Sequence, residues 1–128
     1  MKTILVDAIN TFVIKDEGIF AEMYALLETY PNRKIILTGA NEAQMKEFGL
    51  DMMPYEVFTL SHNPEKTDPR YYLMMLEHFH LAPSDCLSFE HNENAVKSSQ
   101  SVGIQTFHYN MDTRDIPALK AFLDENLV

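Results

Sequence analysis

Short apolar runs alternate with amphipathic segments along almost the whole chain. The runs are rich in Ile, Leu, Val and Phe, as is typical of strands buried on both faces of a sheet. They cover residues 3–6, 34–38, 57–60, 86–90 and 105–109. Helical spacing of apolar residues covers 20–30, 41–48, 69–80, 92–102 and 116–127. This alternation predicts an α/β fold, a three-layer Rossmann-like domain with about five parallel strands and helices on both faces.

Capping residues support the boundaries of the expected helices. Asn41 precedes the second helical pattern and Gly49 follows it, and these residue types favour the start and the end of a helix. Asp68 and Pro69 begin the third pattern in the same way. Residues 8–19 show no obvious element, and they directly follow the first strand. We therefore expect them to form a small flap over the carboxyl edge of the sheet.

Length and charge narrow the function classes. A chain of 128 residues favours one domain, spanning 1–128, with a sizeable core. The net charge of −9 argues against nucleic acid and anionic membranes as main partners. The same charge means that any phosphate site must be locally positive.

Cysteine usage and hydropathy indicate the compartment. Cys86 is the only cysteine, which excludes an intrachain disulfide and fits a reducing environment. No apolar run approaches the roughly 18 residues of a membrane span. The start of the chain becomes acidic too soon for a signal peptide. We therefore expect a cytoplasmic protein.

Two acidic residues close expected strands. Asp7 ends the first strand and Glu90 ends the fourth. A carboxylate at the carboxyl end of a buried strand stands where open α/β sheets bind ligands, and it can serve as a nucleophile or a metal ligand. His91 follows Glu90. Because imidazole is a poor ligand for hard cations, we interpret His91 as a polar loop residue in preference to a metal ligand.

A hydroxyl and a lysine complete the candidate chemistry. Thr38 and Gly39 follow the second strand, where a hydroxyl and an unhindered backbone can bind an anion. Lys66 lies in a loop that enters the third helix, and it supplies a mobile cation in an acidic protein.

The order acid, hydroxyl, lysine, acid resembles that of the haloacid dehalogenase-like (HAD) hydrolase superfamily, from residue 3 to about residue 109. Asp7 matches the family's nucleophile, and Thr38 matches its phosphate-binding hydroxyl. Two longer segments carry the rest of the resemblance: Lys66-Thr67-Asp68-Pro69-Arg70-Tyr71-Tyr72 looks like the family's Lys-x-Asp-Pro-x-x-Tyr, and Phe89-Glu90-His91-Asn92-Glu93-Asn94-Ala95 resembles its fourth motif.

The resemblance implies phosphoryl transfer to Asp7, followed by hydrolysis of the aspartyl-phosphate. Thr38, Gly39 and Lys66 would hold the phosphate, and Lys66 would also stabilise charge during the transfer. Mg²⁺ would be held by Asp7 and Glu90. The expected partner is a small phosphorylated molecule or a protein.

Two departures from the family pattern affect the chemistry. Ile9 stands where family phosphatases have the acid/base Asp, and His91 stands where a second acid is common. The transfer of a proton by such a group is worth roughly 10²–10⁴-fold in rate. About 26 residues separate Asp7 from the second strand, by the family's usual layout too few for a large cap domain.

Three functions stay open at this point. The first is a phosphatase-type hydrolase, weak or specialised because of Ile9. The second is a catalytically inactive HAD-like domain that binds a phosphorylated ligand or a protein partner. The third is metal-independent carbon–halogen chemistry, since Asp7-Ala8-Ile9-Asn10-Thr11-Phe12 also looks like the dehalogenase branch.

Overall fold

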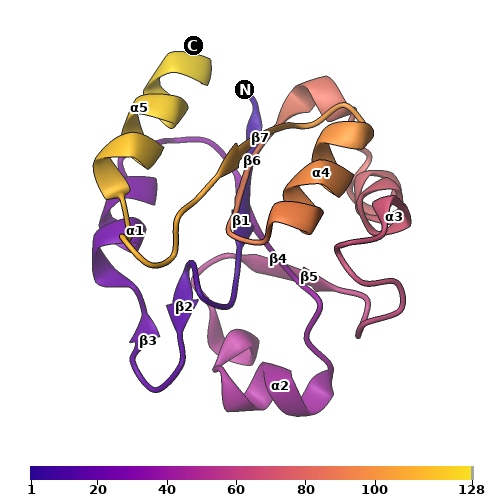
Figure 1. The fold of residues 1–128 in the computed structure, drawn as a ribbon, viewed down its shortest axis with the longest axis horizontal. Coiled ribbons are helices and arrows are strands. Elements are labelled where there is room, and N and C mark those ends of the chain that lie inside the picture. The colour runs from indigo at the N-terminus through magenta and orange to yellow at the C-terminus, as the bar shows by residue number, and fades with distance from the viewer. Residues whose placement is uncertain (128) are drawn as a thin grey trace.

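The computed structural model describes residues 1–127, so the last residue of the expected domain lies outside the described residues. Five parallel strands form one sheet in the order β5-β4-β1-β6-β7 (Figure 1). They are β1 (Thr3–Asp7), β4 (Lys34–Thr38), β5 (Glu56–Thr59), β6 (Cys86–Glu90) and β7 (Gln105–His108). The helices are α1 (Ala21–Leu27), α2 (Glu42–Glu47), α3 (Pro69–Phe79), α4 (Glu93–Ser101) and α5 (Ile116–Asn126). The predicted fold class is therefore confirmed.

The expected element boundaries differ from the observed ones by a few residues. The third strand begins one residue earlier than predicted, at Glu56. The first helix ends at Leu27, because the chain turns before Pro31. Two short 3₁₀ segments, η1 (Leu50–Met52) and η2 (Pro83–Asp85), were not expected. Within residues 1–127, none of the helices has the length and apolar character needed to cross a membrane.

Successive side chains of each strand point to opposite faces of the sheet, so the core has two halves. Ile4 and Val6 of β1 point to one face of the sheet, and Leu5 points to the other. Helices α1 and α5 cover the first face, and α3 and α4 cover the second (Figure 1). Because β1 is buried on both faces, its residues are apolar until the strand reaches the edge of the sheet at Asp7.

The strand order reverses beside β1. The chain passes from β1 to β4 and β5 on one side, and then returns to β6 and β7 on the other. Asp7 pairs with Leu37 of β4, and Val6 pairs with Phe89 of β6, so all three strands end at the same level. Open α/β sheets bind ligands in the crevice outside such a switch point. The fold thus places Asp7 at the edge of the sheet where folds of this kind bind ligands.

The residues expected to form a flap form a hairpin. Strands β2 (Val13–Ile14) and β3 (Gly18–Ile19) pair antiparallel directly after β1 (Figure 1). The tight turn that precedes them depends on Asn10, which adopts a φ of 68°, a left-handed conformation that Asn tolerates. The backbone N–H of Phe12 closes the turn by donating to the Asp7 carbonyl at 3.2 Å. The hairpin therefore begins at the candidate nucleophile.

Tyr71 ties α3 to the ends of two strands. Its ring is fully buried, and its hydroxyl lies 2.8 Å from the Thr38 carbonyl oxygen and 3.2 Å from that of Phe58. This contact fixes the carboxyl ends of β4 and β5 relative to each other.

We predict that Tyr71→Phe lowers the free energy of unfolding by about 1–2 kcal/mol, because buried carbonyl groups lose their donor. Urea unfolding measures the difference. Tyr30→Phe is the matched control, since the Tyr30 hydroxyl donates to Asp124 at the exposed surface. We expect the control to change stability by less than about 0.5 kcal/mol. Equal losses in the two variants would contradict the role of Tyr71.

Candidate active site

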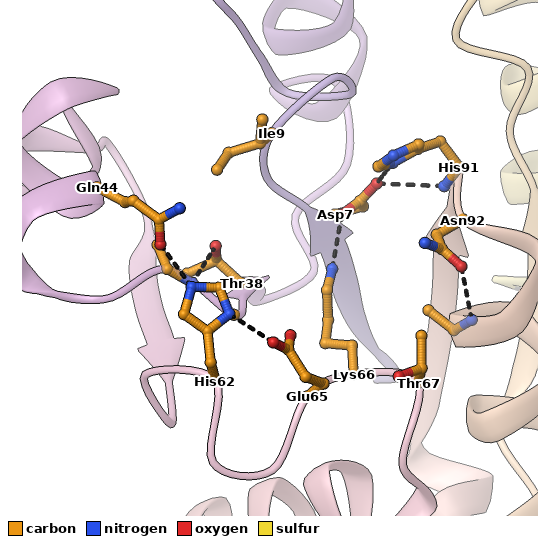
Figure 2. A pocket seen from close by; sticks show the side chains of 13 residues that line it. Asp7, Ile9, Thr38, Gln44, His62, Glu65, Lys66, Thr67, His91 and Asn92 are labelled. Carbon is orange, nitrogen blue, oxygen red and sulfur yellow. Dashed lines mark hydrogen bonds and ion pairs between the residues drawn. The ribbon is translucent and has the colours of Figure 1, made fainter.

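The predicted residues Asp7, Thr38, Gly39 and Lys66 surround one small, open cavity of about 170 Å³ at the carboxyl edge of the sheet. Asp7 and Thr38 reach it from the ends of β1 and β4, and Lys66 reaches it from the loop between β5 and α3 (Figure 2). Glu90 at the end of β6 lies behind it and contacts Lys66. The structure therefore brings together the side chains that the sequence indicated as site residues.

Lys66 lies between two buried carboxylates. Its Nζ is 2.6 Å from Asp7 Oδ1 and 2.6 Å from Glu90 Oε1, and it also donates to the Leu37 carbonyl at 3.1 Å. The side chains of Asp7 and Glu90 are only 3% and 2% exposed. In such a setting the ion pairs are weakly screened, and removal of one partner leaves an uncompensated charge. The ammonium is thus a structural requirement of the site as well as a candidate phosphate ligand.

The ionisation of Asp7 and Glu90 differs because their surroundings differ. Burial alone would raise the pKa of Asp7, but the Lys66 ammonium and the His91 hydrogen bonds outweigh it and hold that pKa well below its usual range. Burial and the adjacent Asp7 charge raise the pKa of Glu90, against the opposing effect of Lys66. Asp7 is therefore the carboxylate that remains fully ionised, which a nucleophile requires.

His91 lies in the loop after β6, as the sequence indicated, and its side chain contacts Asp7 directly. Its Nδ1 lies 2.5 Å from Asp7 Oδ2 and 3.2 Å from Glu90 Oε2, and its backbone N–H donates to Asp7 Oδ2 at 3.2 Å. Hydrogen bonds to Asp7 and Glu90 outweigh burial and raise the pKa of His91 to about 10. At neutral pH the ring is an imidazolium that donates to Asp7.

Thr11 is a site residue that the sequence pattern did not identify. Its buried hydroxyl donates to Asp7 Oδ2 at 2.6 Å, from the turn that begins the hairpin. Its only signal in the sequence is its position four residues after Asp7. Asp7 Oδ2 consequently accepts three donors, whereas Oδ1 accepts Lys66.

The turn after β4 presents Thr38 and Gly39 to the cavity. The Thr38 hydroxyl oxygen accepts a hydrogen bond from the Ala40 amide at 3.1 Å. The hydroxyl proton is therefore available to donate to an anion. Gly39 is closely covered. A Cβ there would lie 3.2 Å from Glu65 Oε2 and 3.4 Å from His62 Nδ1. A larger residue in place of Gly39 would contact His62 and would require the Glu65 carboxylate to shift by a few tenths of an ångström.

His62, Glu65 and Gln44 also line the cavity, although the sequence did not indicate them. His62 Nδ1 lies 2.8 Å from Glu65 Oε1, and His62 Nε2 lies 2.5 Å from Gln44 Oε1 of α2 (Figure 2). Ser61 and His62 both have positive φ, which folds this loop back over Gly39. The loop after β5 thereby forms one rim of the cavity.

The aliphatic side chain of Ile9 also lines the cavity (Figure 2). It occupies the position two residues after Asp7, as the sequence indicated. A hydrocarbon side chain there offers no proton to a reacting group.

The carboxylates fit a magnesium ion poorly in this arrangement. Ligand atoms of Asp7, Glu90 and His91 all lie within 4.8 Å of one another. Mg²⁺, however, requires oxygen ligands in near-octahedral geometry, and His91 offers nitrogen. Every oxygen of the two carboxylates already accepts a donor, from Lys66, His91, Thr11 or the Asn92 amide. Among residues 1–127, no buried side-chain nitrogen or oxygen is left without a partner.

Solved structures share this fold, although no family model and no curated protein matches the sequence. A mutant HAD-family enzyme from Bacteroides thetaiotaomicron, in complex with magnesium and inorganic phosphate, has a TM-score of 0.70 at 12% identity, covering 93% of this chain and 98% of that chain. A subfamily IA HAD-superfamily hydrolase from Geobacter sulfurreducens has a TM-score of 0.54 at 22% identity, covering 77% of this chain and 53% of that one.

A dehalogenase has a TM-score of 0.56 at 21% identity, covering 70% of this chain and 42% of that chain. This chain thus spans about half the length of the dehalogenase and of the Geobacter hydrolase. The fold is that of HAD enzymes, so the resemblance that the motifs indicated is confirmed at the level of the fold.

The raised pKa of His91 predicts a pH dependence of stability. The pKa rises on folding from 6.5 to about 10, so the stabilisation is complete below pH 6.5 and is lost as the pH rises through 10. We expect the free energy of unfolding of the wild type to fall over this pH range. His91→Gln has no titrating ring at this position, so its free energy of unfolding should not show this fall. Urea unfolding of both proteins across the same pH range measures the effect, and parallel curves would contradict it.

Proposed function

We propose that the chain is a HAD-type hydrolase of the phosphatase type, in which Asp7 accepts the phosphoryl group. The observation that carries this proposal is the convergence of an ionised Asp7, the Thr38 hydroxyl and the Lys66 ammonium on one cavity. These three groups supply a nucleophile, a hydrogen-bond donor and a positive charge. Phosphoryl transfer requires these functions, because its catalysis is mostly positioning and charge stabilisation.

The two oxygens of Asp7 have different roles in this mechanism. Oδ2 is held by Thr11 and His91, so Oδ1 is the oxygen that attacks phosphorus. As the Oδ1–phosphorus bond forms, the bond from phosphorus to the leaving oxygen breaks, and the leaving group takes the electron pair. Lys66 and Thr38 stabilise the charge on the transferring oxygens. A water molecule then attacks phosphorus, releases inorganic phosphate and regenerates Asp7, and its proton passes to solvent.

Ile9 determines which substrates suit this site. Because Ile9 cannot protonate a leaving group as an Asp at its position would, the site favours groups that depart readily as anions. Acyl and aryl phosphates release stabilised anions, whereas alkyl phosphates release strongly basic alkoxides. We therefore propose acyl and aryl phosphates as the preferred substrate class. The same lack of a base slows the attack of water, so the aspartyl-phosphate persists.

An inactive domain that binds a phosphorylated ligand or a protein partner is the second candidate. The observation in its favour is that both oxygens of Asp7 are engaged by groups of the chain itself. Lys66 and Thr38 could hold a phosphate group in such a domain without any covalent step. The two functions differ in whether a covalent adduct forms on Asp7.

We predict that incubation with acetyl phosphate adds one phosphoryl group to the intact protein, as measured by mass spectrometry. The reason is that acetate is a good leaving group and needs no acid. Fragment masses should place the adduct at Asp7, and Asp7→Asn should show none. Asp16→Asn is the control, because Asp16 lies in the exposed turn of the hairpin. A folded wild-type protein that forms no adduct would favour the inactive binding domain.

We predict that Ile9→Asp increases turnover of an alkyl phosphate, by roughly 10²–10⁴-fold, since it supplies the missing proton-transfer group. Steady-state rates with glycerol phosphate and with p-nitrophenyl phosphate measure the change, and the gain should be smaller for the aryl ester. Ile9→Asn has nearly the same shape without an acidic proton and should show no gain. Equal wild-type rates for the alkyl and aryl esters would contradict the role assigned to Ile9.

A further inference from the structure

A side chain of the protein itself lies between the two carboxylates of the site. The His91 ring places Nδ1 2.5 Å from Asp7 Oδ2 and 3.2 Å from Glu90 Oε2, with 22% of the side chain exposed. His91 thus engages one oxygen of each carboxylate. A cation could not reach these two oxygens together without displacing the ring.

The backbone around His91 holds the ring there. The Tyr109 amide donates to the Glu90 carbonyl at 2.9 Å, and His108 Nε2 lies 2.9 Å from the His91 carbonyl. Immediately after His91, the Asn92 side chain accepts two amides of the first turn of α4. The backbone at His91 is therefore held by contacts with β6, with the end of β7 and with the start of α4.

The donors around the two carboxylates fill the places that a metal ion would need. Each oxygen of Asp7 and Glu90 already accepts a hydrogen bond from Lys66, Thr11, His91 or the Asn92 amide. Lys66 and Thr38 remain on the cavity side to meet an anion.

We propose that the His91 side chain takes the place of a divalent metal ion beside Asp7 and Glu90, so that the site binds phosphate groups without metal. The inference rests on the proposed function in one respect, namely that the cavity receives a phosphate group. It adds that the chain depends on its own imidazole where the neighbouring Bacteroides enzyme was crystallised with magnesium.

The test compares inorganic phosphate binding in EDTA and in excess Mg²⁺, followed by calorimetry, for the wild type and for His91→Asp. The wild type should bind phosphate equally under both conditions. His91→Asp should bind about tenfold or more weakly in EDTA, because the new carboxylate donates no hydrogen bond to Asp7 and repels an anion. Its binding should recover in Mg²⁺. His80→Asp, the same change at an exposed residue at the end of α3, should behave as the wild type.

Direct metal binding gives a second readout. With Mn²⁺ as a spectroscopic probe, His91→Asp should bind the ion, and the wild type and His80→Asp should not. Circular dichroism confirms that each variant is folded. If His91→Asp does not fold, the wild-type comparison in EDTA and Mg²⁺ still tests the proposal.

The outcomes distinguish failure of the His91 proposal from failure of the proposed function. Phosphate binding by the wild type that appears only with Mg²⁺, or tight Mn²⁺ binding by the wild type, would overturn the role of His91 and leave the proposed hydrolase standing. Absence of phosphate binding and of the acetyl phosphate adduct under both conditions would overturn both proposals.

Discussion

The Lys66 ammonium is the group on which the site depends. Two neighbouring strands of the sheet, β1 and β6, each end in a buried carboxylate, and these charges would repel each other without a cation between them. Lys66 Nζ lies 2.6 Å from each carboxylate, and its side chain is 14% exposed. The loop that carries it is thereby drawn over the edge of the sheet. Its position in turn places His62 and Glu65 at the rim of the cavity.

Local charge balance explains how an acidic chain can hold an anion site. The chain carries a net charge of −9, yet Asp7 and Glu90 are matched by Lys66 and His91 within the site. Glu65 at the rim is paired with His62 at 2.8 Å. The site therefore lacks the excess of negative charge that the chain carries as a whole. An incoming phosphate group would compete with Asp7 for Lys66, which is the exchange that phosphoryl transfer to Asp7 needs.

The strand-end side chains could be predicted from the sequence because they depend on periodicity. Once the apolar runs fix the strands, the parallel sheet brings Asp7, Thr38 and Glu90 to one edge. His62 could not be predicted in this way, because its placement beside Gln44 depends on a loop with residues at positive φ. The role of His91 was missed for a related reason. Its ring direction follows from the contacts of β6, β7 and α4, and the type of residue does not reveal it.

Ile9 and His91 affect different steps of the proposed reaction, and together they define what kind of enzyme can result. A cation beside Asp7 helps the phosphoryl group to arrive, because it offsets the repulsion between carboxylate and phosphate. A proton donor beside Asp7 helps the leaving group to depart and later activates water. In the proposed reaction His91 supplies the first function, and the hydrocarbon side chain of Ile9 supplies nothing for the second. The proposed site would accept a phosphoryl group from an activated donor more readily than it would release it to water, so we expect a long-lived aspartyl-phosphate.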